Sequence, residues 1–436
     1  MVKQKKLNVA VVGGGWAGMS VGADLADNKV PVTIFEASKT LGGRARAVDT
    51  SEAILDNGLH ILIGAYKKTL SKIKQVSEES QKTEVLRLPL NLEIHPNFSY
   101  RASSLFYPLN LMIGLLNAKG LNTIDKLSAF FFIFLIPLLH KKKSISEKTV
   151  SQLLHQFYQS HNVKKYIWEP ICLAALNTPS NIASARVFLS VLRESLFQGA
   201  RSSDLLLPSN DLSNIFPNKA KAFIEKNGGL VLTSTRVTSI EITDRGFIIN
   251  DGRTNAYTHL ILAVAPNHLP SLVRSLPSIK KIIKKVENFE YQPIVSVYLQ
   301  YPKETTLPKP MIGVEDSVCQ WVFDRGTLLG QAGLIGVVIS GPGKHETSDN
   351  KSLAMAVHRT LEREFGFPNF LWHRVIREKK ATLKSSPDRQ DIGNDTDQEN
   401  VFLAGDYTES EYPSTIEAAV RSGEKCAKLI LKNERF

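Results

Sequence analysis

The stretch that decides the fold is "LNVAVVGGGWAGMSVGADLADNKVPVTIFEAS", residues 7 to 38. Its apolar, β-branched start predicts a buried parallel strand, and "PVTIFEAS" predicts a second strand after an intervening helix. Gly13, Gly15 and Gly18 permit a tight turn, the approach of a pyrophosphate and close helix packing, with the helix N-terminus facing the phosphates. Glu36, 18 residues after Gly18, is placed to accept hydrogen bonds from an adenosine ribose. The stretch therefore predicts dinucleotide binding.

A second glycine pair follows in "LGGRARA", residues 41 to 47. Gly42 and Gly43, followed by Arg44, would bring backbone amides and a guanidinium to a pyrophosphate that the first loop already holds. Nicotinamide enzymes have no need of this doublet. Here the chain resembles the superfamily of FAD-dependent amine oxidases and phytoene desaturases, whose members carry it. The resemblance implies FAD as the cofactor.

The far end of the chain supports the same resemblance, because "VFLAGDYTESEYPSTIEAAVRSG", residues 401 to 423, is similar to the closing flavin motif of that superfamily. The resemblance implies that Asp406 holds the ribityl chain and that the helix after Pro413 directs its N-terminus at the flavin ring. It further implies cofactor contacts from Gly405, Thr415, Ile416 and, at the adenine edge, Val237.

The start of the last helix can also be predicted from its residues. The order Ser414, Thr415, Ile416, Glu417 fits a capping box, which marks a helix N-terminus. A positive helix end beside the pyrimidine edge of a flavin would favour the anionic reduced form.

Composition limits the class of protein. A chain of 436 residues fits two or three domains, and 43% hydrophobic with 22% charged residues is typical of a folded globular protein. Three widely spaced cysteines indicate neither a disulfide framework nor a metal site, so we expect no metal and a reducing cytoplasm. The apolar run near the N-terminus is too short for a signal peptide. The net charge of +12 suits nucleic acid or an anionic membrane, but no nucleic-acid-binding signature is present.

The most hydrophobic segment comprises residues 105 to 139. Its run from 129 to 139 holds 11 uncharged residues, short of the roughly 20 that span a bilayer, and Lys141, Lys142 and Lys143 follow directly. Such a helix can lie in the membrane interface with its lysines at the phosphates. It can equally be a core helix with a solvated basic end. The first alternative predicts peripheral contact with the inner face of the cell membrane.

The predicted fold is α/β, with a Rossmann-like FAD-binding domain interleaved with a substrate-binding domain. We assign the FAD-binding domain to residues 1–75, 221–270 and 396–436. The substrate-binding domain then comprises residues 76–220, which include the membrane-associated part, and 271–395.

Several longer stretches narrow the resemblance. They are "LDNGLHILIGAYKKTL", "WEPICLAALNTPSNIASARVFLSVL", "SDLLLPSNDLSNIFP" and "AGDYTESEYPSTIEAAVRSG". Together they resemble the hydroxysqualene dehydroxylase family of bacterial squalene and hopanoid biosynthesis. The resemblance implies replacement of an allylic hydroxyl group by hydrogen, with reduced FAD as the donor and hydroxysqualene as the substrate. Leu59 departs from the pattern, which has a glutamine there.

This reaction needs an acid that protonates the departing hydroxyl group, and a dry channel for a long hydrocarbon. The acid candidates are Asp56, His60, Glu169 and Asp204. The hypothesis is that Asp56 or His60 acts near the reacting carbon, because the resemblance implies that their strand lies against the flavin. The alternative is that Asp56 accepts backbone hydrogen bonds and His60 is a satisfied core histidine. Trp168 either stabilises allylic cation character or packs in the core.

The electron donor and the rival functions stay open. "GPGK", residues 341 to 344, lacks the spacing of a second nucleotide fingerprint, so the donor is a separate reductase or a transiently bound nicotinamide nucleotide. "KKIIKK", residues 280 to 285, either docks an acidic partner or the membrane, or forms a solvated helix face. The rival functions are a carotenoid-type desaturase and a non-catalytic membrane-associated flavoprotein scaffold.

Overall fold

The stretch 7–38 forms β1 (Val9–Val12), α1 (Trp16–Asp27) and β2 (Val32–Phe35), as predicted. In the computed structural model, the described residues are 6–77, 84–140, 142–250 and 256–433. Both strands are buried throughout, because they lie inside a parallel sheet that is covered on its two faces.

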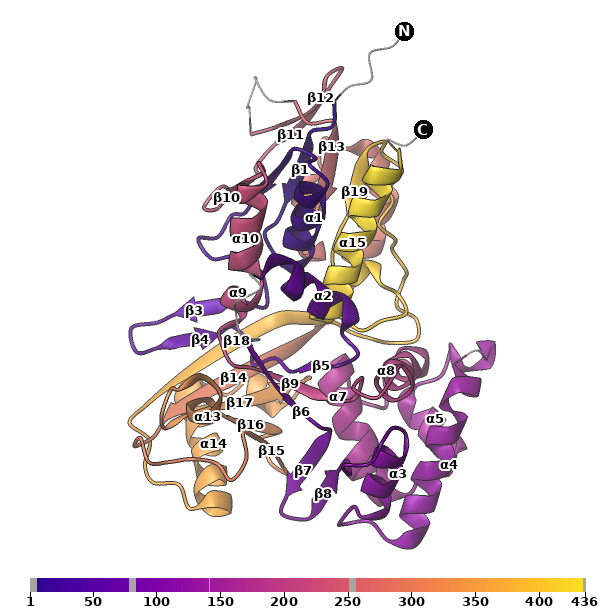
Figure 1. Ribbon diagram of the computed structural model, residues 1–436, viewed down its shortest axis with the longest axis vertical. Coiled ribbons are helices and arrows are strands. Elements are labelled where there is room, and N and C mark those ends of the chain that lie inside the picture. The colour runs from indigo at the N-terminus through magenta and orange to yellow at the C-terminus, as the bar shows by residue number, and fades with distance from the viewer. Residues whose placement is uncertain (1–5, 78–83, 141, 251–255, 434–436) are drawn as a thin grey trace.

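That sheet has five parallel strands in the order β10, β2, β1, β13, β19 (Figure 1). The remaining strands are β10 (Leu230–Leu232), β13 (His259–Leu262) and β19 (Val401–Leu403). The sheet therefore combines three distant parts of the chain, and Val9 of β1 pairs in register with His259 of β13. The α/β prediction is confirmed, while the proposed domain boundaries stay a prediction.

Two layers cover this sheet. A cluster of buried side chains joins it to α1, α10 (Pro217–Lys226) and α15 (Ile416–Asn433). On the other face a second cluster joins it to the hairpin β11 (Ile240–Thr243) and β12 (Gly246–Ile249), and to α11 (Leu269–Leu272) and α12 (Lys280–Glu287).

A second, separate sheet has seven strands in the order β18, β14, β17, β16, β15, β7, β8. Its strands are β7 (Asn91–His95), β8 (Phe98–Arg101), β14 (Tyr291–Gln300), β15 (Met311–Val314), β16 (Trp321–Asp324), β17 (Leu334–Ser340) and β18 (Trp372–Leu383). Only the β15–β7 pair is parallel. Helix α14 (Asn350–Phe365) packs on one face of this sheet.

A helical layer completes the lower half of Figure 1. It contains α3 (Leu109–Leu116), α4 (Thr123–Leu139), α5 (Val150–Gln156), α6 (His161–Val163), a π-helical stretch (Lys164–Trp168), α7 (Glu169–Leu176) and α8 (Ala185–Phe197). One cluster of buried side chains runs through these helices.

Short elements connect the part of the molecule around the five-stranded sheet with the part that contains the seven-stranded sheet and the helical layer. They are the pair β3 (Ala47–Asp49) and β4 (Ile54–Asp56), the sheet of β5 (Leu62–Ile63), β9 (Leu205–Pro208) and β6 (Val85–Leu88), and the helices α2 (Lys67–Val76), α9 (Leu212–Ile215) and α13 (Arg325–Leu329).

Candidate active site

A continuous cavity of about 1610 Å³ lies where the five-stranded sheet, the seven-stranded sheet and the helical layer meet. Its lining includes the two glycine loops, residues 57–63, strand β18 and the loop before α15. Drug-sized ligands occupy roughly 300–1,000 Å³. The cavity therefore has room for a dinucleotide and a second large molecule.

The first glycine loop has the shape that a pyrophosphate requires. Gly13 has a φ of +114°, which favours glycine, and a Cβ on Gly18 would lie 2.0 Å from the carbonyl oxygen of Gly13. A Cβ on Gly15 would instead meet only Gly43, at 3.8 Å from its Cα. The amide of Gly42 donates to the carbonyl of Gly14 at 2.9 Å. The two loops thus hold open a space at the N-terminus of α1, where an anion is stabilised.

Glu36 and Val237 also line this end of the cavity. The two carboxylate oxygens of Glu36 accept hydrogen bonds from the amides of Gly14 and Ser38, both at 2.7 Å. The backbone therefore fixes the carboxylate at the end of β2, beside the first glycine loop, where the sequence predicts that it binds a ribose. These residues fit FAD.

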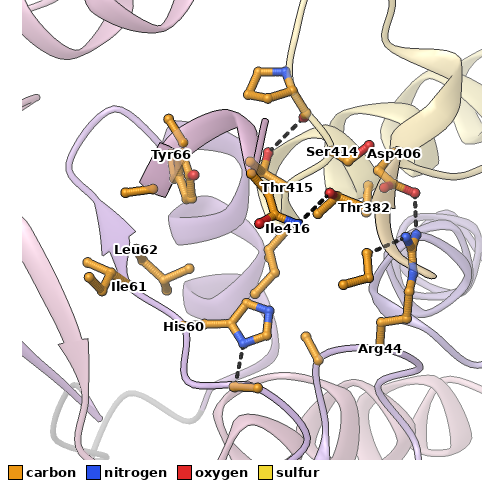
Figure 2. A pocket seen from close by; sticks show the side chains of 18 of the residues that line it. Arg44, His60, Ile61, Leu62, Tyr66, Thr382, Asp406, Ser414, Thr415 and Ile416 are labelled. Carbon is orange, nitrogen blue, oxygen red and sulfur yellow. Dashed lines mark hydrogen bonds and ion pairs between the residues drawn. The ribbon is translucent and has the colours of Figure 1, made fainter. Parts of the chain in front are cut away.

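Arg44 and Asp406 lie against each other (Figure 2). Nη2 of Arg44 is 2.5 Å from Oδ1 of Asp406, and its Nη1 donates to the carbonyl of Ala381 at 2.8 Å. The guanidinium therefore joins the second glycine loop to strand β18 and to the C-terminal motif. Both side chains line the cavity.

The N-terminus of α15 faces the cavity, but the predicted capping box is wrong. The hydroxyl of Thr415 accepts from the amide of Ala418 at 3.2 Å, so Thr415 rather than Ser414 caps the helix. Ser414 accepts instead from the amide of Leu383. Glu417 turns away and accepts from the amide and hydroxyl of Thr69, each at 2.8 Å. This pairing wins because Glu417 is fully buried and needs donors.

Asp56 is buried outside the cavity lining. Its Oδ2 lies 2.9 Å from Nη1 of Arg325, and its Oδ1 accepts from the amide of Leu212 at 3.1 Å. Its carbonyl accepts from the hydroxyl of Tyr298 at 2.7 Å. Both carboxylate oxygens are thus bonded within the protein. This arrangement fits the alternative that Asp56 has a structural role. The predicted catalytic contact of Asp56 is not seen.

His60 does line the cavity (Figure 2). Its Nδ1 lies 2.6 Å from the carbonyl of Gly58, and because a carbonyl only accepts, Nδ1 carries the proton. Burial lowers the pKa of His60 below its ordinary value of 6.5. The neutral ring therefore leaves Nε2 as a lone-pair acceptor, and no described residue hydrogen-bonds that atom.

The other acid candidates lie elsewhere. Glu169 is exposed, and Asp204 forms an ion pair with Arg87 at 3.0 Å. Trp168 touches the cavity, but its ring packs against Phe132 and Phe188 and its Nε1 donates to Gln159 at 2.7 Å. Of the four acid candidates, only His60 lines the cavity.

Several lining residues were missed by sequence reasoning. Asn177, in a left-handed conformation after α7, accepts from the amide of Gly341 at 2.7 Å and donates to Thr382 at 3.0 Å. The family-like stretch around it was the available signal. Tyr66 and Tyr412 also line the cavity, and the hydroxyl of Tyr412 is buried without a hydrogen-bond partner among the described residues. Both tyrosines also lie in family-like stretches, "LDNGLHILIGAYKKTL" and "AGDYTESEYPSTIEAAVRSG", but nothing in the pattern of these stretches singles them out.

The part of the cavity that is lined by the helical layer and the seven-stranded sheet is mainly apolar, and we call it the hydrocarbon half. Its lining includes Leu90, Leu92, Phe98, Leu111, Met112, Leu115, Phe130, Ile133, Ile167, Ile171, Leu192, Met311, Trp321 and Phe323. Leu59 lines it too, and packs against Gly336 of β17 within an apolar cluster. An aliphatic side chain at position 59 therefore matches its surroundings.

Two further features bear on the sequence predictions. Within the described residues, no helix has the length and hydropathy to cross a membrane. The same part of the chain contains no group of three or more His, Cys, Asp or Glu side chains arranged to hold a metal ion.

Comparisons with known proteins identify the family and the fold. The sequence model of the family described as flavin containing amine oxidoreductase matches residues 16–431. A hydroxysqualene dehydroxylase from Rhodopseudomonas palustris is 25% identical, over 97% of this chain and 98% of the relative. A zeta-carotene desaturase from Synechocystis is 23% identical, over 98% of each. The crystal structure of an oxidoreductase from Methanosarcina mazei superposes with a TM-score of 0.73 at 14% identity, over 97% of this chain and 100% of the other, which shows a common fold.

Proposed function

Because the chain belongs to the flavin containing amine oxidoreductase family and is an FAD-dependent oxidoreductase, we propose that it converts hydroxysqualene to squalene by reductive dehydroxylation, a step of squalene and hopanoid biosynthesis. The proposal rests on the contrast between the imidazole of His60 and the mainly apolar lining of the rest of the cavity. One imidazole nitrogen faces a space whose far half is hydrocarbon. A long isoprenoid with a single hydroxyl group matches that pattern.

The reaction removes the hydroxyl group as water and puts hydrogen in its place. When bound, reduced FAD supplies the hydride that bonds to the allylic carbon. The hydroxyl group leaves with the C–O electron pair and must receive a proton. Each turnover oxidises the cofactor by two electrons, which a separate reductase or a transiently bound nicotinamide nucleotide must return.

We assign the proton transfer to His60. In its neutral form the ring accepts a hydrogen bond at Nε2, which orients the substrate hydroxyl group. In its protonated form, Nε2 donates its proton to that group as the C–O bond breaks. Because burial lowers the pKa of His60, the protonated ring is a stronger acid than a free histidine, and the proton transfer is more favourable.

The rest of the chain positions the substrate and excludes water. The apolar lining contributed by α3, α4 and α7 buries the hydrocarbon chain, and this burial is the main source of affinity. A dry cavity also protects developing allylic cation character from attack by solvent.

The test is to incubate purified, FAD-loaded protein with hydroxysqualene, with and without dithionite, and to analyse the extracted lipid. We expect squalene only under reducing conditions. Absence of squalene from fully reduced, FAD-loaded enzyme, with substrate dispersed in detergent, would reject the proposal.

A second function is favoured by the similarity to the zeta-carotene desaturase. A desaturase removes hydrogen from a polyene and consumes oxidised FAD, so it runs in the opposite redox direction. Incubation of oxidised enzyme with phytoene or zeta-carotene separates the two: new conjugated double bonds would absorb in the visible range.

A further inference from the structure

Large apolar side chains on the protein surface are concentrated in one place. Among the described residues, 16 large hydrophobic side chains are exposed, and half of them lie between residues 105 and 138. They are Leu105, Phe106, Leu116, Ile124, Leu127, Phe131, Phe134 and Leu138. Scattered exposed apolar residues are normal, but a gathered set indicates an interaction site.

Helix α4 carries most of this set. Ile124, Leu127, Phe131, Phe134 and Leu138 recur at intervals of three and four residues, so they share one helix face. Each of them is between 59% and 76% exposed. The buried face carries Ala129, Phe132, Ile136 and Leu139. The helix therefore uses one apolar face for the core and presents a second apolar face to the outside.

We call the surface formed by these eight side chains the apolar face. The segment that carries it is basic. Lys119 and, directly after α4, Lys142 and Lys143 are exposed, while Lys141 lies outside the described residues. Between residues 101 and 146 the one acidic residue is Asp125. Asp125 is buried in the capping box of α4 with Asn122.

The cavity reaches this face. Two helices line this end of the cavity: α3 contributes Leu111, Met112 and Leu115, and α4 contributes Phe130, Ile133 and Phe134. Phe134 is 73% exposed and also lines the cavity. The hydrocarbon half of the cavity therefore opens at the apolar face.

We propose that the apolar face docks on a bilayer whose surface carries anionic lipids, as cytoplasmic leaflets do, and that an isoprenoid substrate enters the cavity from the lipid between α3 and α4. The docking surface is inferred from the exposed apolar side chains and lysines, independently of the proposed reaction. The route of entry rests on the function proposed above.

Charge and extent favour a bilayer over a second copy of the chain. A symmetric dimer through this face would bring the surrounding lysines of one copy towards those of the other, which is unfavourable. Phosphate groups of a bilayer surface would pair with these lysines while the apolar side chains enter the acyl boundary. The face also combines α4 with the segment around α3, so it is wider than the single stripe that a helical partner covers.

The experiment is flotation of the FAD-loaded protein with vesicles of phosphatidylglycerol and phosphatidylcholine, and with vesicles of phosphatidylcholine alone. The apolar variant is Leu127→Ser with Phe131→Ser, because neither side chain lines the cavity. Its matched control is Leu230→Ser with Leu371→Ser, which are 56% and 68% exposed elsewhere. The charge variant is Lys142→Glu with Lys143→Glu, and its control is Lys280→Glu with Lys281→Glu on α12.

We expect the wild type and both controls to float with the anionic vesicles. The apolar variant should bind at least about tenfold more weakly, and the charge variant about 30-fold or more, since each lysine near an anionic surface contributes about a factor of five. Equal flotation of the apolar variant and its control would overturn the docking proposal. So would a wild-type dimer in solution that the apolar variant splits into monomers, without vesicle binding by either.

Activity assays separate this proposal from the proposed reaction. With substrate in detergent micelles, the apolar variant should convert hydroxysqualene at the wild-type rate, and with substrate in vesicles it should be slower. An equal rate from vesicles would reject entry from the lipid. No activity in either format rejects the reaction, while flotation still decides the docking.

Discussion

His60 and Asp56 are four residues apart, yet their surroundings differ in kind. The carboxylate of Asp56 is held by a buried arginine and a backbone amide, whereas the imidazole has one nitrogen bonded and the other facing the cavity. Asp56 therefore stabilises the fold through its hydrogen bonds within the protein. The Nε2 atom of His60, which faces the cavity, is available to a ligand.

His60→Gln should reduce kcat/KM for squalene formation by about 100- to 10,000-fold, the usual contribution of a positioned acid. Since burial lowers the pKa of His60 below 6.5, and only the protonated ring donates, wild-type kcat/KM should rise as the pH falls through that lowered pKa. The variant should lose this rise. Steady-state kinetics across pH check it, with the flavin absorbance as the control for cofactor loading. A variant that keeps both the rate and the pH profile would contradict the role of His60.

Asp56→Asn should destabilise the protein without changing any group in the cavity lining. The substitution leaves Arg325, 1% exposed, with an uncompensated buried charge, which costs about 3–5 kcal/mol. Denaturant unfolding of the FAD-loaded protein measures the loss. Glu52→Gln, which breaks the exposed pair with Arg374, is the matched control and should leave the unfolding midpoint nearly unchanged. Equal midpoints for the two variants would show that the buried pair does not brace this segment.

At the scale of elements, the sequence predicts those whose pattern is local. The first strand and helix follow from the apolar pattern and the glycine spacing. The last helix follows from the capping signal at its start, although Thr415 rather than Ser414 is the cap. Strand β18 does not, because "WHRVIREKKATL" is highly charged and half-buried, so it lacks a strand pattern. The partner of Asp56 is hidden for another reason: Arg325 is 269 residues away, and no spacing rule connects them.

The two glycines of the first loop should respond differently to alanine. Gly18→Ala places a Cβ 2.0 Å from a backbone oxygen, so we expect misfolding or a marked loss of stability. Gly15→Ala has space in the protein, and its Cβ would occupy the place of the pyrophosphate. That variant should fold normally but bind FAD at least about tenfold more weakly, the equivalent of one lost charge-assisted hydrogen bond. Circular dichroism and flavin titration separate the two effects. A Gly15→Ala protein with unchanged FAD affinity would contradict the placement of the pyrophosphate.

At the scale of the whole molecule, the cavity lies between parts that the chain contributes in turn. The sequence indicates that the cofactor site is divided among distant segments, because both ends carry flavin motifs. The hydrophobicity of residues 105–139 makes this segment a candidate for the mouth of a hydrocarbon channel, but it does not indicate that the cavity opens between α3 and α4. That result depends on how two helices and a seven-stranded sheet pack, which no local pattern encodes.

FAD should therefore stabilise the molecule as a unit. A ligand present at 1,000 times its Kd raises the free energy of unfolding by about 4 kcal/mol. Thermal unfolding followed by circular dichroism at increasing FAD concentration should show one transition that moves upward. A transition that stays in place while flavin fluorescence reports binding would mean that the site persists in the unfolded ensemble.

The five-stranded sheet has a consequence for the synthesis of the protein. Its edge strand β19 and the helix α15 are made after the other strands of the sheet, and β19 pairs with β13, which was made about 140 residues earlier. At 5–20 residues per second, translation of these intervening residues takes roughly 7 to 28 s. Throughout that interval the cofactor site lacks Asp406 and the N-terminus of α15. FAD insertion therefore follows the synthesis of these elements, and the nascent chain exposes the unpaired edge of β13 until β19 has been made.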